Sequence, residues 1–558
     1  MSTAHLSATG GTLDLHGLLD DARLVVVGGT GFLGKVWLSM LLRYFPEVQH
    51  VWLVVRPRKR ADGSIRQTTE DRFWAEVVPS PVFDPLREQY PGAAFESFIK
   101  AKITPIPGDI TETFAGVPQE VRDEIRGTLT ALVNASGVVD FNPPLDYALN
   151  TNAFGMQNLV ALCRDLGAEG TSGLRMLHTS TCYVAGDRTG QVDEVPPLSF
   201  PFPKADVLDV SHWDAEREIS ECLDLVDNVR HRAEDAFRQN HFLDQAKKNL
   251  KHRNEPQRGT ALDKELKKVK RKFVDNQLVE WGTERAKYWG WHNIYTYTKS
   301  IGEQILARSG LVYSIGRPAV IESSTTFPRV GWNEGINTSA PLIFMGLAGP
   351  YAVPATEDSV LDVIPVDHVA AGMMVSLGEM LEGTHKAVYQ YGSSEMNPLH
   401  MYRMIELVGL FKRRHYAQGG KNPITDFLQR HHEIRPVGTK EYFATGPTWQ
   451  SNKLAALAKS VNNAATGTFQ DILKPVAATM KGLSKGLAMQ ARITDECVPF
   501  TATHNYRFTT LNTRTAWGRL SPELQEQVIF APKQIDWRDY MLEVHCPGLE
   551  ENVSPLIR

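Results

Sequence analysis

Two continuous apolar runs near the N-terminus are separated by a segment of helical periodicity. Residues 24–27 (LVVV) and 50–55 (HVWLVV) are typical of strands that are buried on both faces of a parallel sheet. Between them, the spacing of the apolar residues predicts a helix over residues 35–44. Strand, turn, helix and strand in this order predict the first unit of a dinucleotide-binding α/β sheet.

Later apolar segments extend the same alternation. The segment that ends at residues 106–110 (IPGDI), the run at residues 132–137 (LVNASG) and the run at residues 174–177 (LRML) each resemble a further strand end. A helical pattern covers residues 295–306 (YTYTKSIGEQIL). We therefore expect the α/β class, with a Rossmann-type doubly wound parallel sheet.

Two stretches depart from this alternation. Residues 201–290 are highly charged and helical in pattern, with a break near Pro256–Gly259, and predict a helical insertion in the α/β domain. Residues 452–490 read as an amphipathic helix, in which Pro475 is tolerable only near the start. We divide the chain into an N-terminal extension (1–20), a Rossmann-type domain (21–400) that contains the insertion, and a smaller helical C-terminal domain (401–558).

Composition narrows the class of protein. The chain has 558 residues and a net charge of -4, which gives no reason to expect a nucleic-acid partner. Its five scattered cysteines show no metal-ligand spacing, so we expect reduced thiols in the cytoplasm and no metal site. Residues 1–11 do not resemble a secretory signal, and the apolar stretch 340–353 is shorter than the roughly 20 residues of a membrane span.

A glycine-rich turn follows the first predicted strand directly. Residues 28–34 read Gly-Gly-Thr-Gly-Phe-Leu-Gly, a pattern that lets the backbone approach a pyrophosphate at a helix N-terminus. Arg56 and Arg58 follow the second strand, where a site that prefers NAD would usually carry an acidic residue. Since guanidinium groups pair with a 2′-phosphate, we expect NADPH as the cofactor. A solvated basic loop is the alternative interpretation of this cluster.

Two polar segments carry the predicted chemistry. Thr181 lies just beyond the strand end at residues 174–177, and Tyr295 and Lys299 are four residues apart, on one face of a helix. A lysine ammonium would bring the tyrosine pKa down from about 10 towards a useful range. We predict that Tyr295 and Thr181 hold the substrate oxygen and that Lys299 fixes the nicotinamide ribose.

The adjacent Cys182 offers a covalent thioester route as a minor alternative, although strand alternation would point it away from Thr181. The predicted catalytic residues are Thr181, Tyr295 and Lys299. The predicted cofactor-binding residues are Gly28, Gly29, Thr30, Gly31, Phe32, Leu33, Gly34, Arg56, Arg58, Asp109, Ile110, Asn134, Ala135, Tyr295 and Lys299.

Together these motifs resemble the extended short-chain dehydrogenase/reductase superfamily and, within it, the fatty acyl-CoA reductase family. The resemblance rests on GGTGFLGK at 28–35, YTYTKSIGEQIL at 295–306, GRPAVIESSTTFPRVGWNEG at 316–335 and IPVDHVAAGMM at 364–374. HTSTCYV at 178–184 is similar to the family's strand end, although Thr179 and Cys182 depart from it. In the C-terminal part, NTRTAWGRLSP at 512–522 and IDWRDYM at 535–541 resemble the family's closing helical domain.

The resemblance implies reduction of long-chain acyl-CoA with NADPH to the aldehyde, and in many members on to the primary alcohol. An acyl carrier protein as the thioester carrier, a sugar-nucleotide epimerase or dehydratase, and a non-catalytic NADPH-binding scaffold are the alternatives. For residues 201–290 a solvated helical hairpin, a clamp for the CoA phosphates and contact with an anionic membrane all remain open. For residues 452–490 packing on the core competes with a lid over the acyl chain and with a membrane-surface helix.

Overall fold

A seven-stranded parallel sheet forms the centre of the computed structural model, which describes residues 11–554 apart from 61, 337, 349–350, 418–426, 428–429, 432–433 and 466–469. All six strand pairings in this sheet are parallel. The predicted fold class is confirmed. In spatial order, the strands are β13 (Val388–Tyr391), β9 (Tyr313–Pro318), β7 (Arg175–Thr179), β6 (Ala131–Asn134), β1 (Arg23–Val27), β2 (His50–Val55) and β5 (Ile103–Pro107).

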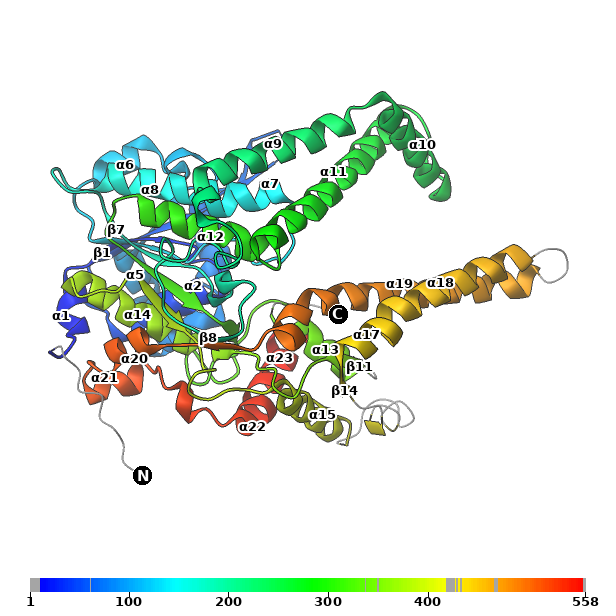
Figure 1. The fold of residues 1–558 in the computed structure, drawn as a ribbon. Coiled ribbons are helices and arrows are strands. Elements are labelled where there is room, and N and C mark those ends of the chain that lie inside the picture. The colour runs from blue at the N-terminus through cyan, green and yellow to red at the C-terminus, as the bar shows by residue number, and fades with distance from the viewer. Residues whose placement is uncertain are drawn as a thin grey trace.

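Helices cover both faces of the sheet (Figure 1). The alternation of β1 shows how: Leu24 and Val26 pack with α2 (Phe32–Tyr44) and α14 (Val366–Glu382), whereas Val25 and Val27 pack with α8 (Gly155–Leu166) and α12 (Ile294–Arg308). Because both faces are buried, β1 needs apolar residues at every position, which explains the unbroken run in the sequence.

Shorter elements complete the first part of the chain. They are β3 (Arg58–Lys59), β4 (Ile65–Gln67), α3 (Thr69–Arg72), α4 (Asp84–Gln89), α5 (Ala93–Lys102), α6 (Gln119–Ile125), α7 (Leu145–Ala148), β8 (Gly190–Val192), β10 (Val320–Glu322), α13 (Ala340–Ala348), β11 (Tyr351–Pro354) and β12 (Val363–Pro365). The stretch that we predicted as an N-terminal extension contains α1 (Leu15–Asp20), and Leu15 and Leu19 of this helix, together with Leu13 before it, are completely buried in the core that contains α14. These three side chains are therefore part of the main core.

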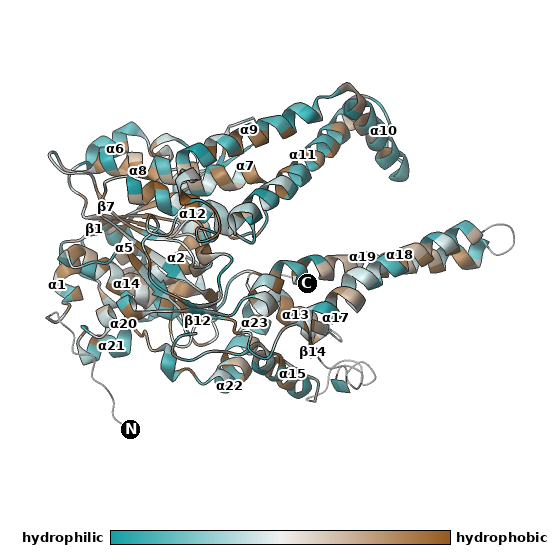
Figure 2. Ribbon diagram, in the orientation of Figure 1, coloured by the Kyte–Doolittle hydropathy of each residue, from teal (hydrophilic) through white to brown (hydrophobic). Residues whose placement is uncertain are grey.

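The charged stretch 201–290 forms three helices, α9 (Ala215–Ala233), α10 (Ala236–His252) and α11 (Gly259–Trp289), which project from the body as an arm (Figure 1). The gap between α10 and α11 falls at the expected break. Where the arm joins the body, α9 and α11 share a buried cluster with α12. The outer part of the arm is largely hydrophilic (Figure 2), as solvated helices require.

The C-terminal part is mostly helical. Its elements are α15 (Met401–Ala417), β14 (Ile434–Val437), α17 (Thr439–Thr445), α18 (Pro447–Ala464), α19 (Gln470–Val498), β15 (Tyr506–Phe508), α20 (Leu511–Trp517), α21 (Pro522–Gln527), α22 (Trp537–Asp539) and α23 (Cys546–Asn552). Two of its strands pair with strands of the preceding part, β14 with β11 and β15 with β8. The two parts of the chain are thus joined through shared sheets as well as through side chains.

The stretch 452–490, which we predicted as one amphipathic helix, is divided between α18 and α19. These two helices form a hairpin that projects on the same side of the molecule as the arm (Figure 1). Pro475 lies in the second turn of α19, close to its start. Among the described residues, no helix has the length and apolar character needed to cross a bilayer.

Candidate active site

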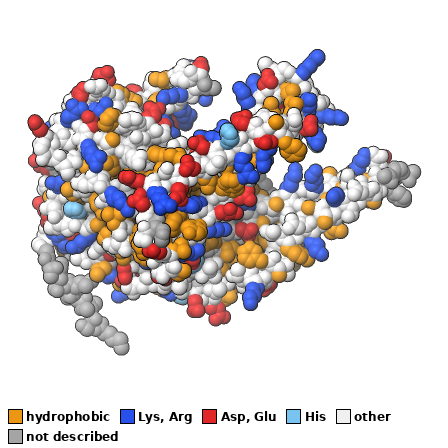
Figure 3. All heavy atoms as spheres, turned by 45° about the horizontal axis from the view of Figure 1, so that its top comes forward, with side chains coloured by type: hydrophobic (Ala, Val, Ile, Leu, Met, Phe, Trp, Pro, Cys, Tyr) orange, Lys and Arg blue, Asp and Glu red, His pale blue; other side chains and the backbone are white. Residues whose placement is uncertain are grey.

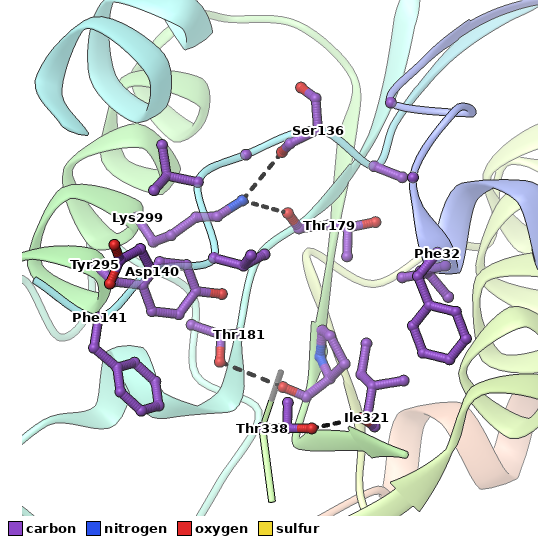
Figure 4. Close-up of a pocket in the computed structure, with 18 of the residues that line it drawn as sticks. Phe32, Ser136, Asp140, Phe141, Thr179, Thr181, Tyr295, Lys299, Ile321 and Thr338 are labelled. Carbon is purple, nitrogen blue, oxygen red and sulfur yellow. Dashed lines mark hydrogen bonds between the residues drawn. The ribbon is translucent and has the colours of Figure 1, made fainter. Parts of the chain in front are cut away.

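A cavity of about 910 Å³ opens at the carboxyl ends of the sheet strands. It lies where the chain turns one way from β1 to β2 and the other way from β6 to β7, the place at which open α/β sheets bind ligands. Residues from the glycine turn, from the ends of β6 and β7, from α12 and from the C-terminal part all line it. Figure 4 shows the part of the wall around Lys299 and Tyr295.

The glycine turn is shaped by close backbone packing. Gly28 has φ +84°, and a Cβ there would lie 2.4 Å from the backbone nitrogen of Ser136. A Cβ on Gly34 would lie 2.3 Å from the carbonyl oxygen of Gly28, so α2 can begin directly against the turn. Of the predicted cofactor residues in this turn, six line the cavity: Gly28, Thr30, Gly31, Phe32, Leu33 and Gly34. Gly29 does not; it packs against Leu53 instead.

The two arginines predicted after β2, Arg56 and Arg58, point to different places in the fold. Arg56 lines the cavity beside Asp109, with 3.4 Å between the guanidinium Nη1 and the carboxylate Oδ2. Arg72, which the sequence analysis did not select, also lines this end and donates from Nη1 to the Arg56 carbonyl oxygen at 2.8 Å. Arg58 is absent from the wall and pairs with Glu76 at 3.0 Å, because β3 leads it away.

Of the two cofactor residues predicted at the end of β6, one lies in the wall of the cavity and the other lies behind it. Ala135 lines the cavity, as does Ile110 beyond β5. Asn134 is buried behind the wall, where its Oδ1 accepts hydrogen bonds from the backbone nitrogen of Ser136 at 3.0 Å and from its hydroxyl at 2.6 Å. Asn134 therefore shapes the cofactor loop and does not itself line the cavity.

Tyr295 and Thr181 meet in the wall of the cavity (Figure 4). The Asn293 side chain caps the start of α12 by accepting from the Thr296 backbone nitrogen at 2.9 Å, which puts Tyr295 in the first turn. Burial raises the pKa of Tyr295 to about 12, and a hydrogen bond with the Thr181 side chain acts against this rise. The phenol is therefore protonated at neutral pH, rather than brought towards ionisation by Lys299 as we expected.

Lys299 lies one helical turn after Tyr295 and points across the crevice. Its Nζ donates to the carbonyl oxygens of Thr179 at 3.0 Å and Ser136 at 3.3 Å (Figure 4). Burial lowers the pKa of this ammonium to about 8. Gly137 makes room for it, since a Cβ there would lie 2.6 Å from Nζ.

Cys182 is turned away from the cavity. Its thiol donates to the carbonyl oxygen of Arg317 at 2.9 Å, and burial raises its pKa well above the ordinary value. Neither the direction of the side chain nor its protonation suits a nucleophile that attacks a thioester in the cavity.

Two distant segments complete the wall. One is the loop between β10 and α13, where Glu334 of the wall pairs with the buried Lys35 of α2 at 2.5 Å. The other is the end of α19 and the turn after it, where Phe500 packs against Phe141 at a ring-centroid distance of 5.6 Å. The sequence motifs did not reveal this second contribution, since residues 492–501 lie about 200 positions from Tyr295 and carry no local signal.

The described residues of the insertion 201–290 contribute no side chain to the wall of the cavity. Among the described residues that line the cavity, none belongs to 201–290, and the lysines of α10 lie on the outer arm. The CoA-phosphate clamp that we considered for these lysines therefore finds no support at this cavity. Nor do the described residues contain a group of three or more His, Cys, Asp or Glu side chains able to hold a metal ion.

The residues present fit a nicotinamide dinucleotide. Glycines without room for a side chain admit a pyrophosphate at the start of α2, two arginines stand at one end of the cavity and a lysine at the other. Ser180 also lines the cavity, and its buried hydroxyl has no hydrogen-bond partner in the described structure. Such a buried hydroxyl is expected to find a partner on a bound molecule.

Comparison with known proteins agrees with this geometry. An NAD-binding family model described as male sterility protein matches residues 26–373, well over half of the chain. The chain belongs to the male sterility protein family. It is 26% identical over 554 residues to "Probable fatty acyl-CoA reductase 4" of Arabidopsis thaliana, covering 95% of this chain and 97% of that protein.

Two further relatives carry similar names. The "Alcohol-forming fatty acyl-CoA reductase" of Simmondsia chinensis is 25% identical, with 96% of this chain and 98% of that protein covered. "Fatty acyl-CoA reductase 2" of Homo sapiens is 22% identical, with 93% of this chain and 82% of that protein covered.

Among solved structures, the terminal R domain from the myxalamid PKS-NRPS biosynthetic pathway has 13% identity and a TM-score of 0.48, covering 97% of this chain and 92% of that chain.

The resemblance expected from the sequence motifs is thereby confirmed. This member of the male sterility protein family is an oxidoreductase with a nicotinamide cofactor, and its curated relatives are fatty acyl-CoA reductases along nearly the whole chain.

Proposed function

We propose that this chain reduces long-chain fatty acyl-CoA with NADPH, first to the aldehyde and then to the primary alcohol. The observation that carries the proposal is the pairing of Tyr295 with Thr181 in the same cavity as the glycine turn and Lys299. A protonated phenol and a hydroxyl at one point form a site for a carbonyl oxygen on which negative charge develops. The name of the Simmondsia chinensis relative supports the alcohol as end product.

The two arginines support NADPH over NADH. Arg56 and Arg72 are cations at the end of the cavity opposite Lys299, and Asp109 pairs with Arg56 there. A 2′-phosphate would find a guanidinium fork beside it at this position. The exposed Arg56 side chain, 61% accessible, is free to turn onto such a phosphate.

The roles of the residues follow from their environment. When bound, the nicotinamide cofactor supplies a hydride to the thioester carbonyl carbon. Thr181 and Tyr295 hold the carbonyl oxygen, and the Tyr295 hydroxyl, kept protonated by burial, gives that oxygen its proton. The resulting hemithioacetal loses CoA as the free thiol and leaves an aldehyde. For a second reduction the site takes up a fresh NADPH as hydride donor, and Tyr295 regains its proton from solvent. Tyr295 and Thr181 can then hold the aldehyde oxygen in the same way, while the Lys299 ammonium orients the cofactor ribose.

The wall beside Tyr295 suits an alkyl chain. Phe141 lies 6.5 Å from Tyr295 between ring centroids, and Phe500, Ile321 and Leu342 add apolar surface to the same cavity. Apolar side chains of this kind bind a hydrocarbon by removing its surface from water. We therefore place the acyl chain against these residues.

The test is to incubate purified protein with NADPH and palmitoyl-CoA while recording NADPH absorbance, released thiol and the lipid products. Two NADPH consumed for each CoA released, with hexadecanol as product, is the expected result; a ratio of one with trapped aldehyde would correct the end product. An acyl carrier protein thioester run in parallel distinguishes the carrier. Absence of any acyl-dependent NADPH loss over a range of chain lengths would leave a non-catalytic binder and refute the proposal.

A further inference from the structure

The hairpin formed by α18 and α19 is held together by small side chains. Ser451 and Ala458 of α18, with Ala477 and Ser484 of α19, are its buried residues along the contact between the helices. The hydroxyl of Ser451 donates to the carbonyl oxygen of Ser484 at 2.9 Å, and the Ser484 hydroxyl returns the bond to Ser451 at 3.1 Å. Close approach through serine and alanine leaves the larger apolar side chains of both helices outside the contact.

Those larger side chains face solvent. The exposed apolar residues of the hairpin are Trp449 (45% accessible), Leu457 (54%), Val476 (41%), Leu483 (59%) and Met489 (51%). Figure 1 shows that they belong to helices standing clear of the body, so no other described element covers them. Apolar side chains gathered on one projecting element indicate contact with a partner or a lipid surface.

The charge of the hairpin is mostly positive. Helices α18 and α19 contain six cationic side chains and three acidic ones, two of them in the last turn of α19 at the base, although the chain as a whole has a net charge of -4. On α19, Lys474, Lys481 and Lys485 recur at steps of seven and four residues, which puts them along one edge of the helix. Lys and Arg side chains are visible along the α18–α19 hairpin beside hydrophobic ones (Figure 3). The set is Lys453, Lys459, Lys474, Lys481, Lys485 and Arg492, against Asp471, Asp495 and Glu496.

The base of the hairpin belongs to the active-site cavity. Arg492, Ile493, Glu496 and Cys497, all near the end of α19, line that cavity. The same helix therefore carries exposed apolar and basic residues on its outer part and cavity-lining residues at its base.

We propose that the α18–α19 hairpin docks on the surface of a bilayer that contains anionic phospholipid. Apolar side chains on an exposed helix, with lysines along one edge and only Asp471 as an acid on its outer part, are the features that let a helix lie in the headgroup region. Contact at the surface, rather than insertion across the bilayer, agrees with the lack of a spanning helix among the described residues. If the proposed function holds, the docked hairpin brings the cavity mouth to the place where long-chain substrate and product accumulate.

Flotation of the full-length protein with vesicles tests the docking without any substrate. Binding to vesicles of phosphatidylcholine with phosphatidylglycerol, but much weaker binding to phosphatidylcholine alone, is expected at low ionic strength, with release as salt rises. The triple variant Lys474→Gln, Lys481→Gln, Lys485→Gln should weaken binding roughly 100-fold. The double variant Val476→Gln, Leu483→Gln should weaken it about 10-fold or more, even for anionic vesicles.

A matched control lies on α10, in the arm formed by α9, α10 and α11. The triple variant Lys247→Gln, Lys248→Gln, Lys251→Gln removes the same charge from α10 and should leave flotation unchanged. Equal loss from this control would show that binding follows total charge and would overturn the proposal. So would unchanged flotation of both hairpin variants.

Two more outcomes separate this proposal from others. If wild-type protein ignores vesicles but forms a dimer that Leu483→Gln dissociates in sedimentation analysis, the surface belongs to a second copy and the lipid proposal fails. Reductase activity on a short-chain, water-soluble acyl-CoA should be the same in the hairpin variants and the wild type. Loss of activity in every form, with flotation intact, would count against the proposed function alone.

Discussion

At the scale of the residue, the environment of each catalytic side chain determines its protonation. Burial raises the pKa of Tyr295 to about 12 and lowers that of Lys299 to about 8, so one group is held as a neutral acid and the other stands near the point at which it loses its charge. The four-residue spacing identifies the pair, but it does not reveal how deeply both side chains are buried.

Tyr295→Phe should lower turnover by roughly 10²–10⁴-fold, the usual effect of removing a general acid, while the affinity for NADPH changes little. Single-turnover kinetics and fluorescence titration of NADPH measure the two effects. Tyr288→Phe, at an exposed position of α11, is the control and should behave as wild type. Turnover close to wild type in Tyr295→Phe would remove this residue from catalysis.

The pH profile should reflect Lys299. Its ammonium exists below the pKa, which burial lowers from 10.5 to about 8, so kcat/KM is expected to fall as the pH rises through about 8. Lys299→Arg keeps the cation at all these pH values. In any activity that this variant retains, the alkaline limb should move upward. A limb at the same pH in both proteins would assign it to another group.

Arg56 and Arg72 should together determine the choice of cofactor. Arg56→Ala is expected to raise the KM for NADPH by roughly 10-fold or more, as for a lost charged hydrogen bond, and to alter any residual KM for NADH far less. Arg72→Ala should act in the same direction. Arg58→Ala, whose side chain pairs with Glu76 away from the cavity, provides the comparison and should change neither constant. Equal effects on the two cofactors would argue against recognition of the 2′-phosphate.

At the scale of the element, α12 is fixed to the sheet by a buried ion pair. Glu303, on this helix, accepts from Arg317 of β9 through two hydrogen bonds of 2.9 and 2.6 Å, with both side chains under 10% exposed. Because Tyr295 and Lys299 lie on the same helix, this pair sets the position of both relative to β9 and to its neighbour β7, which Thr181 follows. The sequence shows Glu303 as one more polar residue in a helical pattern and gives no partner for it.

Glu303→Ala should lower the free energy of unfolding by roughly 3–5 kcal/mol, since it leaves the Arg317 charge buried without its carboxylate partner. Replacing both residues with methionine should recover most of that loss. Denaturant unfolding measures both changes. Glu406→Gln, in the exposed pair with Arg403, is the control and should change stability by less than about 1 kcal/mol.

At the scale of the whole molecule, the active site is assembled from both ends of the chain. Phe500 comes from the C-terminal part and packs against Phe141 and Tyr183 beside the catalytic residues. The strand pairs β15–β8 and β14–β11 hold that part against the α/β sheet. The predicted boundary at residue 400 remains a proposal about chain organisation, while the cavity itself draws on both sides of it.

Phe500→Ala should lower kcat/KM for palmitoyl-CoA roughly 10-fold more than for a short acyl-CoA, because the lost apolar surface contacts only a long chain. The ratio between the two substrates is the measurement, since it is insensitive to a general loss of folded protein. Phe237→Ala, at an exposed position of α10, is the control and should leave the ratio unchanged. An equal loss on both substrates would place the acyl chain elsewhere.

The sequence by itself determined the features that depend on local order. Continuous apolar runs give strands buried on two faces, the glycine spacing gives a turn that only small residues can form, and four residues put Tyr295 and Lys299 on one helical face. The tertiary structure alone decided which of several similar residues reach the cavity. It brought in Arg72 and Phe500, left out Arg58 and set the two catalytic pKa values, because burial and distant contacts depend on how far-separated segments pack.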